Sequence, residues 1–184
     1  MARLHYSAIC SLDGYVADEL GRFDWAVPDA EVHAFVNDLE RPIGTYLYGR
    51  RMYDVMAGWD IKDPDRSPES QEYAAIWQTA EKVVFSSTLV ETWTNRTRLV
   101  RRFDPAVIRQ LKGNSRRDLS VGGPTLAGVT LHAGLVDECH LIVAPVIVGG
   151  GLPVFPGHLR QPMNLYHERR FGNGMVYLRY RIPH

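Results

Sequence analysis

The stretch that decides the fold is "VGGPTLAGVTLHAGLVDECHLIVAPVIVGGG", residues 121–151. It starts at the end of an apolar, strand-like segment, passes two glycines and enters a helix-like segment that Pro124 opens and Gly134 closes. A nearly continuous apolar run over 138–151 follows, and such a run is typical of a strand buried on both faces of a parallel sheet. The stretch therefore predicts a strand–helix–strand unit.

The rest of the chain continues this alternation. Apolar segments predict strands over 3–17, 45–49, 82–87, 97–100 and 118–123, and helical periodicity and capping residues predict helices over 29–39, 50–56, 69–82 and 104–113. The segments 163–171 and 175–182 flank Gly172-Asn173-Gly174, which predicts a terminal hairpin. We expect an α/β fold in which helices flank both faces of a mainly parallel central sheet that ends in a C-terminal antiparallel hairpin.

Length and composition bound the number of domains and the class of partner. The chain has 184 residues, of which 45% are hydrophobic, and this predicts one domain over 1–184. Lys plus Arg and Asp plus Glu both count 21, so no net charge is available to hold a polyanion, and nucleic acid is not expected as the main partner. No stretch contains 18 uninterrupted apolar residues. We expect a cytoplasmic protein without a membrane partner.

Several common catalytic patterns are absent from the sequence. The seven histidines form no H-x-x-x-H or H-E-x-x-H pair, and Cys10 and Cys139 lie singly in apolar segments, so no metal site is expected. Neither G-x-S-x-G nor G-K-[ST] occurs, which leaves a serine hydrolase elbow and a nucleoside triphosphatase loop without support.

The glycine pair at 122 and 123 indicates a possible phosphate site. If a strand ends at Gly122 and a helix begins near Pro124, free backbone N–H groups and the positive end of the helix dipole face one point. Two residues without side chains would let a ligand approach the backbone closely. The alternative is a tight strand-to-helix turn with no ligand, and the pair by itself favours neither interpretation.

Two further strand ends carry residues that suit phosphate. Gly49 is followed by Arg50 and Arg51, whose guanidinium groups can bind phosphate with two hydrogen bonds each. The strand predicted at 82–87 ends in Ser86, Ser87 and Thr88, which offer three hydroxyls. Three such strand ends at the carboxyl edge of one parallel sheet are what a dinucleotide needs.

Three carboxylates near the first strand and first helix are candidates for acid–base chemistry. Asp13 stands in the turn-forming pair Asp13-Gly14, and Asp29 and Glu31 stand at the start of a predicted helix. Their structural alternatives are turn former for Asp13 and helix cap or first-turn acid for the other two.

Together these motifs carry a resemblance to a known family. "SLDGYVA", "GRRMYD", "VVFSS" and the block "VGGPTLAGVTLHAGLVDECHLIVAPVIVGGGLPVF" resemble the dihydrofolate-reductase-like superfamily. The likeness is closest to the reductase domain of bacterial riboflavin biosynthesis, the RibD C-terminal domain, and to its stand-alone relatives. It covers nearly the whole chain and is weakest over 57–75 and 88–115.

The resemblance implies an NADPH-dependent reductase that forms a homodimer. The cofactor pyrophosphate would lie against Gly122, Gly123, Pro124, Thr125 and Leu126. The adenosine half and its 2′-phosphate would lie near Gly49, Arg50, Arg51, Met52, Ser86 and Ser87. The nicotinamide would be bordered by Ile9, Val16 and Ala17.

On the substrate side, Asp13 matches the acid that riboflavin-type reductases carry beside their substrate. We expect Asp13, or Asp29 as second candidate, to orient the substrate or to relay a proton, with water as the alternative donor. Trp25, Phe35 and Tyr53 are expected to wall the pocket by stacking on a flat ring, with a core position as the alternative for Phe35. The expected reaction is hydride transfer to a carbon of a small heterocycle, such as a pterin or riboflavin precursor, or of a carbonyl compound.

The sequence also departs from the family in ways that limit the substrate. Folate reductases place an acid two positions after the W-x-x-P proline, where this chain has Ala30, so dihydrofolate is not expected as the substrate. The zinc deaminase motifs H-x-E and P-C-x-x-C of the bifunctional riboflavin protein are absent. Two alternatives stay open: a flavin- or deazaflavin-dependent reductase on the same fold, and a non-catalytic nucleotide-binding homodimer.

Overall fold

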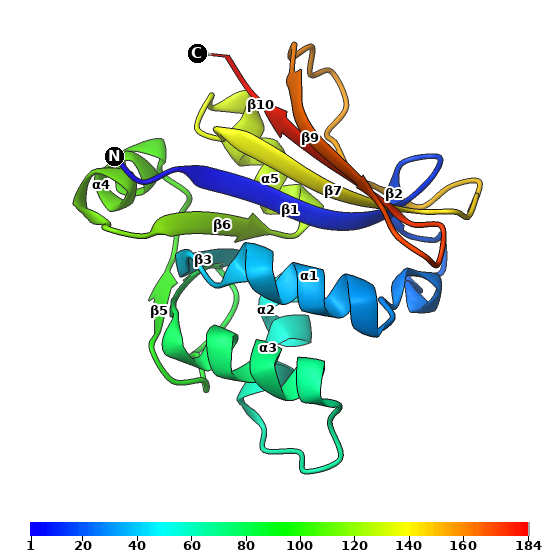
Figure 1. The fold of residues 1–184 in the computed structure, drawn as a ribbon. Helices are drawn as coiled ribbons and strands as arrows, with labels where there is room; N and C mark the ends of the chain where they lie inside the picture. The colour runs from blue at the N-terminus through cyan, green and yellow to red at the C-terminus, as the bar shows by residue number, and fades with distance from the viewer. Residues whose placement is uncertain (184) are drawn as a thin grey trace.

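The computed structural model describes residues 1–183 and alternates strands with helices along the chain (Figure 1). The strands are β1 Leu4–Ser11, β2 Tyr15–Ala17, β3 Ile43–Gly49, β4 Glu81–Phe85, β5 Thr97–Val100, β6 Asp118–Gly122, β7 Glu138–Ala144, β8 Leu152–Pro153, β9 Asn164–Arg170 and β10 Val176–Arg181. The helices are α1 Ala30–Glu40, α2 Arg50–Met56, α3 Pro68–Thr79, α4 Pro105–Asn114 and α5 Pro124–His132, with short 3-10 turns η1 Asp24–Ala26 and η2 Ala57–Asp60.

The central sheet has eight strands in the order β5-β4-β3-β6-β1-β7-β10-β9. The first six are parallel to their neighbours, and β10 pairs antiparallel with both β7 and β9. The last two strands form the predicted hairpin, and its turn places Gly174 at φ +87° while the Phe171 N–H donates to the Met175 carbonyl at 2.9 Å. The predicted mainly parallel sheet with a C-terminal hairpin is confirmed.

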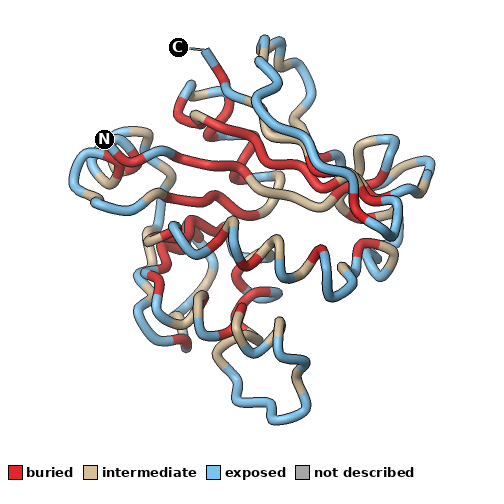
Figure 2. Tube along the Cα trace, in the orientation of Figure 1, coloured by how far each residue is buried: buried red, intermediate tan, exposed pale blue. Residues whose placement is uncertain are grey.

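Helices cover both faces of this sheet, as predicted. On one face, α4 and α5 bury Ile108, Leu126 and Leu131 against β1, β3, β6 and β7. On the other face, α1, α2 and α3 bury residues such as Val32 and Trp77 against β3, β4, β7 and β10. The strands therefore contribute side chains to both layers, and the buried colour runs along the central strands in Figure 2. Within residues 1–183, no helix combines the length and apolar character needed to span a bilayer.

The apolar run over 138–151 is not one long strand, contrary to the prediction. β7 ends at Ala144, and residues 145–151 form an irregular loop. Pro145 has no N–H to donate to a neighbouring strand, and the Val146 N–H turns back to the Ala144 carbonyl at 2.8 Å. The prediction that Gly113 follows the end of the fourth helix is also wrong, because α4 includes Gly113 and runs to Asn114.

One buried carboxyl makes the fold sensitive to pH. Glu40 ends α1 and is 6% exposed, and its Oε2 atom has no hydrogen-bond partner. The Tyr46 hydroxyl lies close to it without the geometry of a hydrogen bond. Burial raises the pKa of Glu40 from 4.5 to about 7. The folded state therefore holds a proton that the unfolded state releases at lower pH.

We expect Glu40→Gln to stabilise the protein at alkaline pH. Stability is lost as the pH rises from 4.5 through 7 because the unfolded chain binds fewer protons in that window, and the loss is at most about 3 kcal/mol. Urea unfolding at pH 5 and pH 8 measures the effect: the variant should gain stability at pH 8 and little at pH 5. The control Asp38→Asn removes an exposed carboxyl of the same helix and should show no such difference. An equal change at both pH values would contradict the account of Glu40.

Candidate active site

At the carboxyl end of β6, the chain leaves the sheet toward the opposite face from the chain at its two neighbouring strands. β3 and β1, the neighbours of β6, lead into α2 and α1, which cover one face of the sheet. β6 leads into α5, which covers the opposite face. The connections therefore leave to opposite sides, and ligands of open α/β sheets bind outside the strand ends at such switch points. The end of β6 is therefore the first candidate for a binding site.

The two glycines at this point are required by the fold itself. A Cβ on Gly122 would lie 2.6 Å from Cε1 of Tyr48, and a Cβ on Gly123 would lie 3.0 Å from Cβ of Met52. Gly123 also has φ +86° and ψ 131°, a backbone conformation that side chains disfavour. Tyr48 and Met52 thus supply a structural reason for both glycines, as expected for the tight strand-to-helix turn, and a ligand at this point is not needed to explain them.

The first turn of α5 follows directly. Gly123 caps the helix without a side-chain acceptor, and Pro124 and Thr125 stand at the first helical positions. Thr125 is exposed, whereas Leu126 is buried in the core below α5. Pro124 and Thr125 can therefore present surface to a ligand at the switch point, and Leu126 anchors the helix beneath it.

The predicted basic and hydroxyl residues gather at the neighbouring strand ends. Arg50 and Arg51 begin α2 at the end of β3 and are both exposed. The Nη1 atom of Arg50 donates to Oγ1 of Thr88 at 3.0 Å, which joins the end of β3 to the loop after β4. Ser87 is exposed in that loop, but Ser86 is buried, and its Oγ accepts the N–H groups of Thr88 and Leu89 at 3.3 and 3.0 Å. Ser86 thus shapes the loop, while Arg50, Arg51 and Ser87 remain accessible.

The residues predicted to border the nicotinamide lie on β1 and β2. Ile9 is half-buried and packs beneath α1. Val16 packs toward the α5 layer, and Ala17 is buried and pairs with Leu152 of β8. Ile9 lies near the end of β1, and β2, which carries Val16 and Ala17, follows directly, so these residues lie across β6 from the arginines.

Asp13 is exposed in the turn between β1 and β2, and its carboxylate already has partners. Oδ1 accepts the Val148 N–H at 3.2 Å, and Oδ2 accepts the Gly149 N–H at 2.8 Å. The neighbouring Ser11 hydroxyl, together with the hydrogen bonds from Gly149 and Val148, holds the pKa of Asp13 below its usual value of 3.8. A carboxylate in this state is ionised at neutral pH, which disfavours the predicted proton-relay role. Asp29 is the N-cap of α1, where its Oδ1 accepts the Val32 N–H at 3.0 Å.

Two of the predicted aromatic pocket walls are core residues. Tyr53 is fully buried and its hydroxyl hydrogen-bonds Thr94 Oγ1 at 3.1 Å, so it has no ring face to offer a substrate, contrary to the prediction. Phe35 packs against Phe171 and Tyr177 with ring centroids 5.2 and 4.8 Å apart, which matches its alternative as a core residue.

Trp25 keeps a feature that a core residue usually lacks. Its ring is half-buried in η1, and its indole N–H is buried without a hydrogen-bond partner among residues 1–183. A buried donor left in this state is uncommon. Trp25 therefore stays a candidate for the substrate side.

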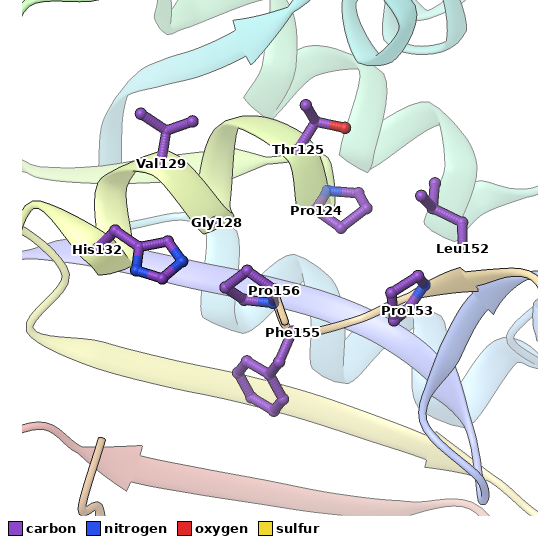
Figure 3. Close-up of a pocket in the computed structure, with 9 residues that line it drawn as sticks. All are labelled: Pro124, Thr125, Gly128, Val129, His132, Leu152, Pro153, Phe155 and Pro156. Atoms are coloured by element: carbon purple, nitrogen blue, oxygen red, sulfur yellow. The ribbon is translucent and has the colours of Figure 1, made fainter. Parts of the chain in front are cut away.

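A second hollow lies beside the first turn of α5 (Figure 3). It has a volume of about 250 Å³ and is lined by Pro124, Thr125, Gly128, Val129, His132, Leu152, Pro153, Phe155 and Pro156. Figure 3 shows the α5 side chains on one side and those of β8 and the segment that follows it on the other. The lining is mainly apolar, so this hollow suits an apolar group better than a phosphate. Sequence reasoning did not identify it.

A buried polar cluster on β1 and β7 has the interatomic distances of a metal site, but positively charged side chains already surround its carboxylate. His5, Glu138 and His140 bring ligand-type atoms within 4.8 Å of one another. The oxygens of Glu138, however, bind Arg3 at 3.1 Å and Arg179 at 2.6 Å. Burial opposes the charge of Glu138, yet hydrogen bonds from His140 and Arg179 bring its pKa to about 2. Arg181 adds a third guanidinium group, 3.5 Å from Oε1 of Glu138, so a cation there would face three positive charges and the geometry favours an internal ion-pair cluster.

Comparison with known proteins decides the family. The family model of the RibD C-terminal domain matches residues 2–177. The chain belongs to the RibD C-terminal domain family. An uncharacterized Bacillus subtilis protein, YyaP, is 30% identical over 173 residues, which are 92% of this chain and 89% of that protein. The resemblance inferred from the sequence motifs is thereby confirmed.

Solved structures support the same fold for this RibD C-terminal domain protein. A candidate riboflavin biosynthesis protein from Shewanella has a TM-score of 0.78 at 23% identity, with both chains fully covered. A deaminase/reductase from Thermotoga maritima, described as a 5-amino-6-(5-phosphoribosylamino)uracil reductase, has a TM-score of 0.69 at 16% identity, with 99% of this chain and 57% of that chain covered. At these identities the likeness shows the fold.

Proposed function

We propose that this protein is an NADPH-dependent reductase that transfers a hydride to a small heterocycle, of the pterin or riboflavin-precursor class, or to a carbonyl compound. The proposal rests on one observation above all: the two exposed arginines that begin α2 lie next to the topological switch point at the end of β6. Membership of a family that includes reductases of riboflavin biosynthesis agrees with it.

The residues at the switch point fit the chemistry of such a cofactor. The first turn of α5 offers backbone N–H groups to a pyrophosphate, and Gly123 adds no side chain of its own there. Arg50 and Arg51, with Ser87, supply the charge and hydroxyl that a 2′-phosphate requires. When bound, NADPH supplies the hydride.

The chain's own part in the reaction is to bind, to orient and to exclude water. Ile9, Val16 and Ala17 offer apolar surface to one face of a nicotinamide ring, and Trp25 lies on the same side of the sheet as Ile9. As the hydride adds to the substrate carbon, the adjoining nitrogen or oxygen takes a proton, which water supplies because Asp13 is ionised. We also propose that the protein is a homodimer, which light scattering tests.

Turnover of NADPH tests the proposed function directly. We expect loss of the reduced nicotinamide absorbance when the protein is mixed with NADPH and a panel of pterins, ribosylaminopyrimidines and carbonyl compounds. Tight NADPH binding with no oxidation across the panel would favour a non-catalytic nucleotide-binding protein. A visible flavin or deazaflavin spectrum in the purified protein would favour a reductase that uses that cofactor instead.

A further inference from the structure

The loop between β7 and β8, residues 145–151, is attached to the end of β1 by a small set of hydrogen bonds. The Leu12 N–H donates to the Val146 carbonyl at 2.8 Å. One residue further along, the Asp13 carboxylate accepts the N–H groups of Val148 and Gly149 at 3.2 and 2.8 Å. Both loops are irregular and exposed, so these contacts are what hold one against the other.

A buried serine fixes the turn that carries Asp13. Ser11 is 0% exposed at the end of β1, and its Oγ accepts the Tyr15 N–H at 2.9 Å. The Ser11 carbonyl accepts the Gly14 N–H at 3.0 Å and closes the same turn. Ser11 thus fixes the turn from which the Asp13 carboxylate reaches the loop.

The attached loop passes close to the nicotinamide side of the candidate site. A Cβ on Gly151 would lie 2.1 Å from the carbonyl oxygen of Ala17, and a Cβ on Gly150 would lie 2.8 Å from Oε1 of Glu19. Gly149 and Gly151 have φ values of +80° and +128°. A loop with this glycine content has little stiffness of its own, so its position depends on the contacts made at its ends and by Asp13.

We propose that Ser11 and Asp13 are positioning residues, which together hold loop 145–151 beside the nicotinamide end of the site through the N–H groups of Val148 and Gly149. The attachment of the loop follows from the geometry alone. The effect of that attachment on turnover rests on the proposed function. In this arrangement the Asp13 carboxylate accepts the two backbone hydrogen bonds from Val148 and Gly149 and is not the source of the proton.

Hydrogen exchange tests the structural consequence in the free protein, without cofactor or turnover. Asp13→Ala should raise the exchange rates of the Val148 and Gly149 amides about tenfold or more, because a hydrogen bond to a charged group contributes about 1.5–3 kcal/mol. Ser11→Ala should raise them by a smaller factor, because it loosens the turn and keeps the carboxylate. The control Asp104→Asn alters another exposed acid that accepts a backbone N–H, that of Ala106 in α4, and should leave loop 145–151 unchanged. Unchanged exchange in Asp13→Ala would overturn the proposal.

The catalytic consequence is tested by the pH profile of kcat with NADPH and an accepted substrate. Asp13→Asn keeps an oxygen acceptor and should retain measurable turnover with an unaltered pH profile. Asp13→Ala should lower kcat/KM further than Asp13→Asn does. The NADPH Kd of Asp13→Ala should change less than about threefold. Loss of turnover in Asp13→Asn together with loss of a pH limb would overturn the proposal and make Asp13 the proton donor. If the wild type oxidises no NADPH, the proposed function fails, while the exchange experiment still decides whether Ser11 and Asp13 hold the loop.

Discussion

Replacing Arg50 and Arg51 together by Ala is expected to weaken NADPH binding by about 30- to 100-fold and NADH binding by less than about threefold. Both side chains are exposed at the start of α2, and only the 2′-phosphate of NADPH offers them a doubly charged partner. Hydrogen bonds to charged groups contribute about 1.5–3 kcal/mol, and solvent exposure reduces the value for each arginine. Equilibrium titration of both nucleotides measures the two ratios.

The matched control for that pair removes two positive charges elsewhere. Arg109 is exposed on α4, and Arg116 is exposed just before the amino end of β6, at the opposite edge of the sheet. The Arg109→Ala/Arg116→Ala variant should bind NADPH almost as the wild type does, because charges separated by more than a Debye length are screened. Equal losses for NADPH and NADH in the Arg50/Arg51 variant would contradict the assignment of the 2′-phosphate to these residues.

Gly123→Ala is expected to destabilise the protein by about 3 kcal/mol even in the absence of cofactor. The substitution places a Cβ 3.0 Å from Cβ of Met52 and forces a side chain into positive φ. Overpacking costs about 1–3 kcal/mol and an unfavourable backbone region a further 1–3 kcal/mol. Urea unfolding measures the loss.

A second glycine, at the other end of α5, separates the cost of overpacking from the cost of the unfavourable backbone conformation. Gly134 also has positive φ, at +62°, but a Cβ there would meet nothing within 4 Å. Gly134→Ala should therefore lose only about 1–2 kcal/mol, the cost of the left-handed backbone alone. If both variants lost the same stability, crowding by Met52 would not be a reason for glycine at the end of β6.

The fold was predictable because each element carries its own local signal. Asp104-Pro105 and Ser67-Pro68 begin α4 and α3 as an N-cap followed by proline, and Gly134 ends α5 in the left-handed region. The 138–151 run shows where such signals fail. It is apolar from Leu141 to Val148 except that Pro145 interrupts it, and the missing N–H of Pro145 separates the strand from the loop that follows.

The sequence predicts which strand ends form the candidate site, but it does not predict which side chains there are exposed. Strand-like and helix-like segments alternate along the sequence, which predicts parallel strands. Gly49 and Gly122, at the ends of two such strands, therefore lie at one edge of the sheet. Whether Tyr53 faces solvent or the core depends on α2 packing against the loop that contains Thr94, 41 residues away, and no periodicity in a seven-residue helix reveals this. The role of Ser11 was missed for the same reason, since its partners are set by the turn that follows.

A crystal structure of the protein with NADPH tests the central claim most directly. The account predicts one cofactor across the carboxyl edge of the sheet, with its pyrophosphate at Gly123–Thr125, its 2′-phosphate within hydrogen-bonding distance of Arg50 or Arg51, and its nicotinamide between Ile9 and Ala17. A cofactor bound elsewhere, such as in the apolar hollow between α5 and residues 152–156, or a 2′-phosphate that contacts neither arginine, would contradict it.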